Sequence, residues 1–124
     1  MMYVLDTNVL SELRPGKPKA SAAVRAWSAT VPQARIYLSA ITVLEQELGV
    51  LRLERRTPPE GSALRAWWDA TLRAFADRVL PLDLKAAQLC ATMHVSNPKA
   101  YRDAMLAATA LAHGFSVVTR NVGD

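Results

Sequence analysis

The sequence has few of the residues that build disulfide-linked proteins or zinc sites. It contains one cysteine, Cys90, and two histidines, His94 and His113, among its 124 residues. A single cysteine cannot form an internal disulfide, and its apolar neighbours in a helical pattern favour a small buried side chain. The two histidines stand apart on predicted helices, and His113 lies beside Gly114 as is typical of a helix end. A zinc site is therefore disfavoured, because zinc prefers clustered cysteine and histidine ligands.

Long apolar runs, repeats and low-complexity segments are also lacking. The longest apolar stretches fall far short of a membrane span, and no charged-then-apolar leader opens the chain. These absences favour a cytoplasmic protein without membrane contact. With 51% apolar and 21% charged residues, the composition is that of a globular protein, and its length predicts a single domain over residues 1–124. The last predicted strand is followed by only a few residues, so a truncated C-terminal end is expected.

The balance of charge is basic. The formal net charge is +4 and the isoelectric point is about 9.6. A basic balance favours a polyanionic partner such as nucleic acid, although it bears on association rather than on fold. No glycine-rich phosphate loop accompanies it, which disfavours an α/β phosphoryl-transfer protein.

Short apolar strands alternate with helical patterns along the chain. The predicted strands cover residues 2–5, 36–38, 79–82 and 115–119. The predicted helices cover residues 9–13, 20–29, 43–55, 62–78, 84–95 and 104–113, and the segment 57–61, which contains two prolines, is predicted to be a loop. This alternation predicts an α/β fold with a parallel sheet.

Two apolar patterns predict how the helices pack. The helix over 43–55 carries an apolar stripe made of Val43, Leu44, Leu48 and Leu51. In the next helix Trp67 and Trp68 are adjacent and cannot both enter one narrow core seam. One of them is therefore expected to cover a neighbouring element or a partner chain.

The first predicted strand ends on an acid. Asp6 follows an apolar run, and Thr7 or Asn8 is predicted to cap the helix that comes next. Ligands of open parallel sheets bind just beyond the carboxyl ends of the strands, so Asp6 is a candidate functional residue. Taken alone, Asp6 is equally compatible with a simple helix cap.

Further carboxylates and amides stand at strand ends or in early helical turns: Glu45, Asp103, Asn121 and Asp124. Carboxylates that gather without a lysine or histidine repel one another, unless a proton or a cation joins them. A hard divalent ion such as Mg²⁺ or Mn²⁺ suits such a set because it prefers oxygen ligands. Isolated helix acids are surface residues in most proteins, however, so spacing alone does not decide the matter.

Blocks of sequence spread over nearly the whole chain resemble PIN-domain proteins of the VapC toxin type, close to the FitB-like branch. The blocks are LDTNVLSE at 5–12, LSAITVLE at 38–45 with Gly49-Val50 behind it, DAMLAATA at 103–110 and VVTRN at 117–121. The order and spacing of these blocks indicate this family far more specifically than any single acidic residue does.

The resemblance implies roles for particular residues. It makes Asp6, Glu45 and Asp103 the metal ligands, and it favours Glu45 over the nearby Glu47 because Glu45 lies four residues before Gly49. The fourth acidic position falls on Asn121, which departs from the members that carry an acid there, and Asp124 is a candidate to supply the missing carboxylate. Supporting groups that would orient the ligands are Thr7, Asn8, Glu12 and Thr119.

The resemblance also implies a fold, an activity and partners. It predicts a three-layer α/β/α sandwich with a central parallel sheet and a Mg²⁺- or Mn²⁺-dependent endoribonuclease. It further implies a homodimer held inactive by a small cognate antitoxin of the VapB kind. Candidates to guide the RNA backbone electrostatically are Arg52, Arg55, Lys99, Arg102 and Arg120.

Two other functions remain open from the sequence. The first is a PIN-like protein that binds RNA or a partner without cleaving it, its site being degraded at Asn121. The second is a phosphoryl-transfer protein with an aspartate nucleophile, such as a phosphatase or receiver domain. The second is disfavoured because Thr7 and Asn8, rather than another aspartate, follow Asp6.

Overall fold

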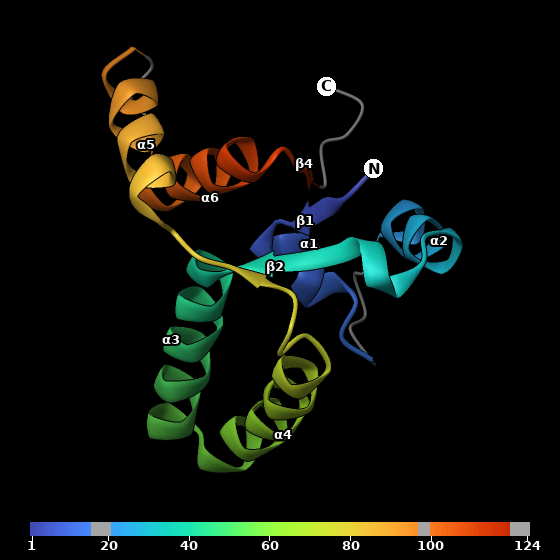
Figure 1. Ribbon diagram of the computed structural model, residues 1–124. Helices are drawn as coiled ribbons and strands as arrows, with labels where there is room; N and C mark the ends of the chain where they lie inside the picture. The colour runs from blue at the N-terminus through green and yellow to red at the C-terminus, as the bar shows by residue number, and fades with distance from the viewer. Residues whose placement is uncertain (16–20, 97–99, 120–124) are drawn as a thin grey trace.

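A parallel sheet lies at the centre of the protein in the computed structural model, which describes residues 1–15, 21–96 and 100–119. Within these residues the strands are β1 (Tyr3–Leu5), β2 (Ile36–Ser39), β3 (Val79–Leu80) and β4 (Ser116–Val118). They pair in the order β3-β2-β1-β4, and each pair is parallel. The predicted parallel sheet is confirmed (Figure 1).

Helices fill the connections between the strands and cover both faces of the sheet (Figure 1). They are α1 (Thr7–Glu12), α2 (Ala22–Thr30), α3 (Ala40–Arg56), α4 (Pro58–Ala74), α5 (Leu84–Ser96) and α6 (Tyr101–His113), with a short 3-10 helix at Gln33–Arg35. The described helices are each too short or too polar to cross a membrane.

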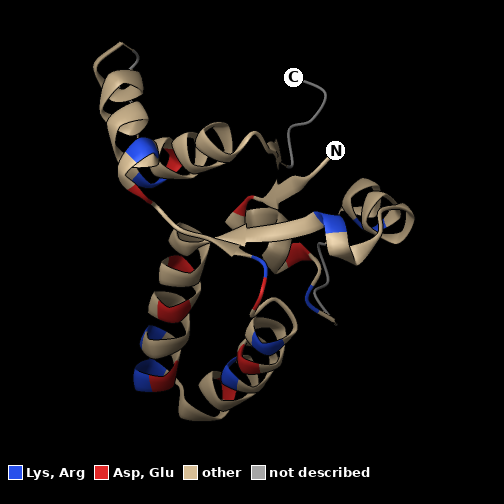
Figure 2. Ribbon diagram, viewed as in Figure 1, with Lys and Arg blue, Asp and Glu red and all other residues tan. Residues whose placement is uncertain are grey.

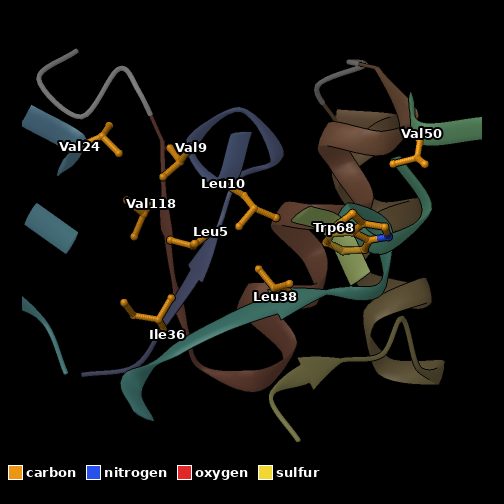
Figure 3. Close-up of a cluster of buried hydrophobic side chains, with 9 residues drawn as sticks. All are labelled: Leu5, Val9, Leu10, Val24, Ile36, Leu38, Val50, Trp68 and Val118. Carbon is orange, nitrogen blue, oxygen red and sulfur yellow. The ribbon is translucent and has the colours of Figure 1, made fainter. Parts of the chain in front are cut away.

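The alternation of side chains along the strands divides the core into two sides. On one side Leu5 of β1 and Leu38 of β2 pack with residues of α1 to α4. The members of this larger cluster are Leu5, Val9, Leu10, Val24, Ile36, Leu38, Val50, Trp68 and Val118 (Figure 3). On the other side Val4 packs against Leu106 and Ala110 of α6. Helices therefore enclose the sheet from both sides, which confirms the predicted three-layer sandwich.

Side chains at the strand ends start the helices. Asp6 is the N-cap of α1, and its carboxylate accepts a hydrogen bond from the backbone N–H of Asn8 at 3.2 Å. The prediction that Thr7 or Asn8 caps this helix was therefore wrong by one or two positions. Asp83 caps the start of α5 in the same way, since its carboxylate accepts from the N–H of Ala86 at 3.0 Å.

The segment predicted as a loop at 57–61 belongs to a helix, which corrects the sequence prediction. Helix α4 begins at Pro58, and proline fits the first helical turn because the N–H it lacks has no partner there. Gly61 lies where α4 crosses α3, and a Cβ atom added to it would collide with the backbone of Glu54. Glycine thus permits the close approach of the two helices.

Only part of the apolar stripe predicted for α3 faces the core: Val43 packs against the larger cluster and Leu48 is half-buried. Leu44 and Leu51 are 46% and 55% exposed, whereas Ile41 and Val50 are buried. The helix begins at Ala40, earlier than predicted, and its buried face also carries polar side chains. The prediction was therefore right for Val43 and wrong for Leu44 and Leu51, which form an exposed edge of the helix.

Helices α3 and α4 are held together by ionic and hydrogen bonds. Arg65 of α4 forms ion pairs with Glu47 at 3.1 Å and Glu54 at 3.3 Å. Hydrogen bonds to these carboxylates, chiefly that of Glu54, raise the pKa of Arg65 above its ordinary value. The indole N–H of Trp68, which is fully buried, donates to Glu47 at 2.7 Å. Trp67 is only half-buried, which confirms that the adjacent tryptophans take different environments.

Candidate active site

The carboxyl end of β1 lies at a topological switch point of the sheet. From β1 the chain places β2 and β3 on one side, and then places β4 on the opposite side of β1. Crevices at such points are the usual ligand sites of open parallel sheets. Asp6 follows β1 directly, and its backbone N–H donates to the carbonyl of Val118 in β4 at 3.0 Å. Asp6 therefore stands where both strands end.

Two helices bring further acids to the same edge of the sheet. Helix α3 follows β2 and helix α6 precedes β4, so the first turns of both helices lie near the carboxyl ends of the strands. Glu45 stands early in α3, and Asp103 is exposed in the first turn of α6. The guanidinium of Arg102 is 3.8 Å from the carboxylate of Glu45, which places the start of α6 beside α3.

A chain of hydroxyl groups leads from the interior to Glu45. The hydroxyl of Ser39 donates to Thr42 at 3.3 Å, the hydroxyls of Thr42 and Thr7 are 3.1 Å apart, and Thr7 donates to Glu45 at 2.6 Å. Because an ionised carboxylate only accepts, the hydroxyl of Thr7 is used in donating to Glu45 and accepts from Thr42. Each hydroxyl in this series of hydrogen bonds therefore donates toward Glu45. The bond from Thr7 to Glu45 has the short length of a charge-assisted hydrogen bond.

Sequence reasoning missed the part that Ser39 and Thr42 play in this chain. Both side chains are fully buried, and Ser39 also caps α3 by accepting from the N–H of Thr42 at 3.1 Å. The sequence indicated polar caps at these positions. A buried strand that ends on a hydroxyl, opposite Thr7 at the end of the neighbouring strand, is the signal that points to a shared role.

The donor set at this edge fits a hard divalent cation. Asp6 and Glu45 offer oxygen atoms only, the side chain of Glu45 is 29% exposed, and Arg102 is too distant at 3.8 Å for a hydrogen bond. Two carboxylates without a closer positive charge suit Mg²⁺ or Mn²⁺. Across the described residues, side chains of three or more acids, histidines or cysteines do not come close enough to hold a metal ion. The set of Asp6, Glu45 and Asp103 therefore stays a prediction.

The other predicted supporting residues take varied positions. Asn8 is exposed. The buried Glu12 accepts a hydrogen bond from the N–H of Ser21 at 3.1 Å, which connects the end of α1 to the start of α2. Thr119 is half-buried directly after β4. Glu47, the rival of Glu45, is bound to residues of α4 and is directed away from Thr7. The predicted site residues Asn121 and Asp124 lie outside the described residues.

The candidate RNA contacts are spread over two helices. Arg52 and Arg55 are exposed in the last turns of α3, where basic residues follow the acidic middle of the helix (Figure 2). Arg52 lies seven residues beyond Glu45, or about 10 Å along the helix at its usual rise. Arg102 is exposed at the start of α6 beside Glu45. Lys99 and Arg120 lie outside the described residues.

Comparison with known proteins identifies the family. A family model described as PIN domain matches residues 3–123. The chain therefore belongs to the PIN domain family, in its VapC and FitB branch.

Individual relatives agree with this assignment. The VapC ribonuclease Y4jK of Sinorhizobium fredii is 38% identical over 97% of this chain and 87% of its own length. Toxin FitB of Neisseria gonorrhoeae is 36% identical over 99% of this chain and 90% of its own length. The crystal structure of FitAcB from the same organism contains a chain that is 37% identical, with a TM-score of 0.84 over 98% of this chain and 89% of that chain.

Proposed function

We propose that this protein is the toxin of a type II toxin–antitoxin system and a Mg²⁺-dependent endoribonuclease acting in the cytoplasm. The observation that carries the proposal is the short hydrogen bond from Thr7 to Glu45, 2.6 Å long, at the strand end where Asp6 stands. It brings the sequence block of Asp6 into contact with the block of Glu45, which supports a shared site. The relatives named VapC ribonuclease and Toxin FitB support the same activity.

The residues of the site have separable tasks in this proposal. Asp6 and Glu45 would hold the metal ion, and Asp103 would complete the set from α6. The hydroxyl of Thr7 fixes the orientation of Glu45 and keeps one of its oxygens hydrogen-bonded. A bound Mg²⁺ supplies an activated water and neutralises charge on the attacked phosphate. Arg102, beside Glu45, provides a positive charge for the RNA backbone near this point.

An antitoxin is the proposed regulator. Solved structures similar to this chain include FitAB bound to a DNA fragment, in which one chain is 36% identical with a TM-score of 0.77 over 98% of this chain. This likeness supports a VapB-like antitoxin as the partner, and the family resemblance adds the proposal that the toxin forms a homodimer. Expression of the protein alone is then expected to arrest growth, and co-expression of the antitoxin is expected to restore it.

Removal of the metal tests the activity directly. Purified protein incubated with structured RNA is expected to cleave it in Mg²⁺ or Mn²⁺ and to stop when EDTA is added in excess. Activity should return when Mg²⁺ is restored, because a carboxylate site binds the ion reversibly. Cleavage that persists in EDTA would contradict the proposed mechanism. Folded protein that binds RNA and cleaves none of it in either metal would favour a binding protein instead.

Loss of the Thr7 hydroxyl is expected to weaken the metal site without unfolding the protein. Thr7→Val keeps the shape of the side chain and removes the hydrogen bond to Glu45. Groups that orient a metal ligand typically contribute 10- to 100-fold to affinity or activity. The Mg²⁺ concentration for half-maximal cleavage should therefore rise by about 10- to 100-fold, with recovery at high Mg²⁺.

The matched control is Thr92→Val on α5, whose hydroxyl donates to the backbone carbonyl of Gln88 and to no other group among the described residues. Its Mg²⁺ dependence should equal that of the unmodified protein. An unchanged Mg²⁺ dependence in Thr7→Val would show that Glu45 needs no such orientation.

A further inference from the structure

A cleft opens beside the predicted metal site of Asp6, Glu45 and Asp103, which we call the carboxylate site. It has a volume of about 280 Å³ and shares Thr7 and Glu45 with that site as part of its wall. We call the part beyond them the flanking cleft, and its lining includes Ser11, Arg14, Gln46, Gly49 and Trp67. Its volume is near the lower end of the range of roughly 300–1,000 Å³ that is usual for small-ligand sites. The cleft is therefore sized for one small unit of a larger ligand.

Gly49 keeps this cleft open. It lies within helix α3, where glycine is unfavourable relative to alanine because it loses more backbone freedom on folding. A Cβ atom added to Gly49 would meet no atom within 4 Å among the described residues, in contrast to Gly61, where it would strike the backbone of Glu54. The packing of the described chain thus does not require glycine at position 49. The space in front of it belongs to the cleft.

The polar groups of the flanking cleft are placed for hydrogen bonding to a ligand. Gln46 is only 8% exposed, and its side-chain amide donates to the hydroxyl of Ser11 at 3.1 Å. Its amide oxygen has no hydrogen-bond partner among the described residues, so it can accept from a ligand N–H. The hydroxyl of Ser11 accepts from Gln46 and keeps its own hydrogen for donation. Together they present an acceptor and a donor.

Charge and an aromatic surface complete the chemistry of the cleft. Arg14, at the end of α1, has no carboxylate partner in the described part of the chain. The indole of Trp67 is half-buried and lines the cleft from α4. An unpaired guanidinium suits a phosphate, and an indole face suits a stacked base. This combination is how single-stranded RNA is recognised in many proteins.

We propose that the flanking cleft binds one nucleotide of the RNA next to the phosphate that is cleaved. Its base stacks on Trp67, the edge of the base meets Gln46 and Ser11, and its phosphate faces Arg14. This inference rests on the proposed function, since the cleft shares Thr7 and Glu45 with the carboxylate site. It adds residues that select and position the substrate without taking part in bond cleavage.

Filling the cleft from Gly49 tests the proposal. Gly49→Leu places a side chain in open space, so folding should be retained, while the room for a base is lost. Loss of one base–aromatic stack corresponds to about 5- to 150-fold in binding. KM for a short single-stranded RNA should rise by that factor, with kcat changed less than about twofold. Gly49→Ala adds only one carbon, so its rise in KM should be smaller than that of Gly49→Leu.

Arg14→Gln supplies an independent measurement. Removal of one phosphate contact should reduce the slope of log affinity against log salt by about 0.7 for single-stranded RNA. The binding is measured in an Asp6→Asn background, so that the RNA stays intact.

The matched control for the bulk that Gly49→Leu adds is Ala66→Leu, at an exposed position of α4. The KM of Ala66→Leu should not change.

The outcomes separate the cleft from the activity. If the unmodified protein cleaves RNA and Gly49→Leu keeps the same KM, the cleft does not bind substrate and the inference is overturned. If Gly49→Leu keeps its KM but escapes inhibition by the antitoxin, the cleft receives the antitoxin instead. If the unmodified protein cleaves no RNA but Gly49→Leu still weakens RNA binding, the cleft binds a nucleotide of RNA, while the nuclease function and the position beside a cleaved phosphate are overturned.

Discussion

Asp6→Asn is expected to abolish nearly all RNA cleavage while leaving the protein folded. A metal ion contributes several kcal/mol of charge stabilisation to such a reaction, and each 1.4 kcal/mol is about tenfold in rate. Loss of a ligand charge should therefore lower kcat/KM by about 10²- to 10⁴-fold. The measurement is cleavage of a labelled RNA in Mg²⁺, together with thermal unfolding of the same sample.

This substitution also separates the two roles of Asp6. Asp6 is the N-cap of α1, accepting from the N–H of Asn8, and asparagine caps helices about as well as aspartate. The melting temperature should thus stay nearly unchanged while activity is lost. Asp77→Asn, at a residue that is 86% exposed, is the control for removal of a surface charge. Full activity in Asp6→Asn would show that Asp6 is a helix cap and not a ligand of the catalytic metal.

Trp68→Ala is expected to have the largest effect on stability. The indole is fully buried between the sheet and helices α3 and α4 (Figure 3). Truncation of a buried tryptophan to alanine costs about 3–5 kcal/mol, because transfer energy is lost and a cavity remains. For a domain of this size the melting temperature should fall by roughly 10–25 °C. Thermal or urea unfolding followed by circular dichroism measures the change.

Two controls accompany this measurement. Trp68→Phe keeps an aromatic ring and removes the N–H that donates to Glu47, so its loss of stability should be smaller than that of Trp68→Ala. Leu84→Ala truncates a side chain that is 75% exposed and should change stability by less than about 0.5 kcal/mol. A Trp68→Ala protein as stable as Leu84→Ala would contradict the packing described for α3 and α4.

The fold was largely predictable because strand and helix segments alternate along the sequence and differ in the spacing of their apolar residues. Val4 and Leu5 point to opposite faces of the sheet, and Gly114 ends α6 in a left-handed conformation with φ of 74°. One error came from a local signal with two meanings, and the other from a pattern that does not report tertiary contacts. Pro58 and Pro59 indicated a loop, yet prolines at the start of a helix are compatible with it. Leu44 marked the wrong face of α3 because hydrophobicity does not distinguish a core from an exposed stripe.

The candidate site was predictable only in part. The acids were found through the resemblance of four sequence blocks, since an isolated Glu45 or Asp103 has no distinctive local pattern. The link from Thr7 to Glu45 spans 38 positions in the sequence, and no local rule brings such residues together. The contributions of Ser39 and Thr42 depend on how β1 and β2 lie side by side. Those contacts follow from the order of the strands, which short-range patterns do not encode.

The small residues between α5 and α6 have a consequence for motion in the protein. These helices share a cluster of Cys90, Ala104 and Ala108, and α5 packs mainly on α6 rather than on the sheet (Figure 1). Leu89, Met93 and Met105 complete this cluster, so α5 is held chiefly by α6 and can open without disrupting the sheet, as a segment of lower local stability than β1. Its amide protons should exchange with solvent well before those of β1. Helix α6 also packs on the sheet through Leu106, so Asp103 keeps its place when α5 opens.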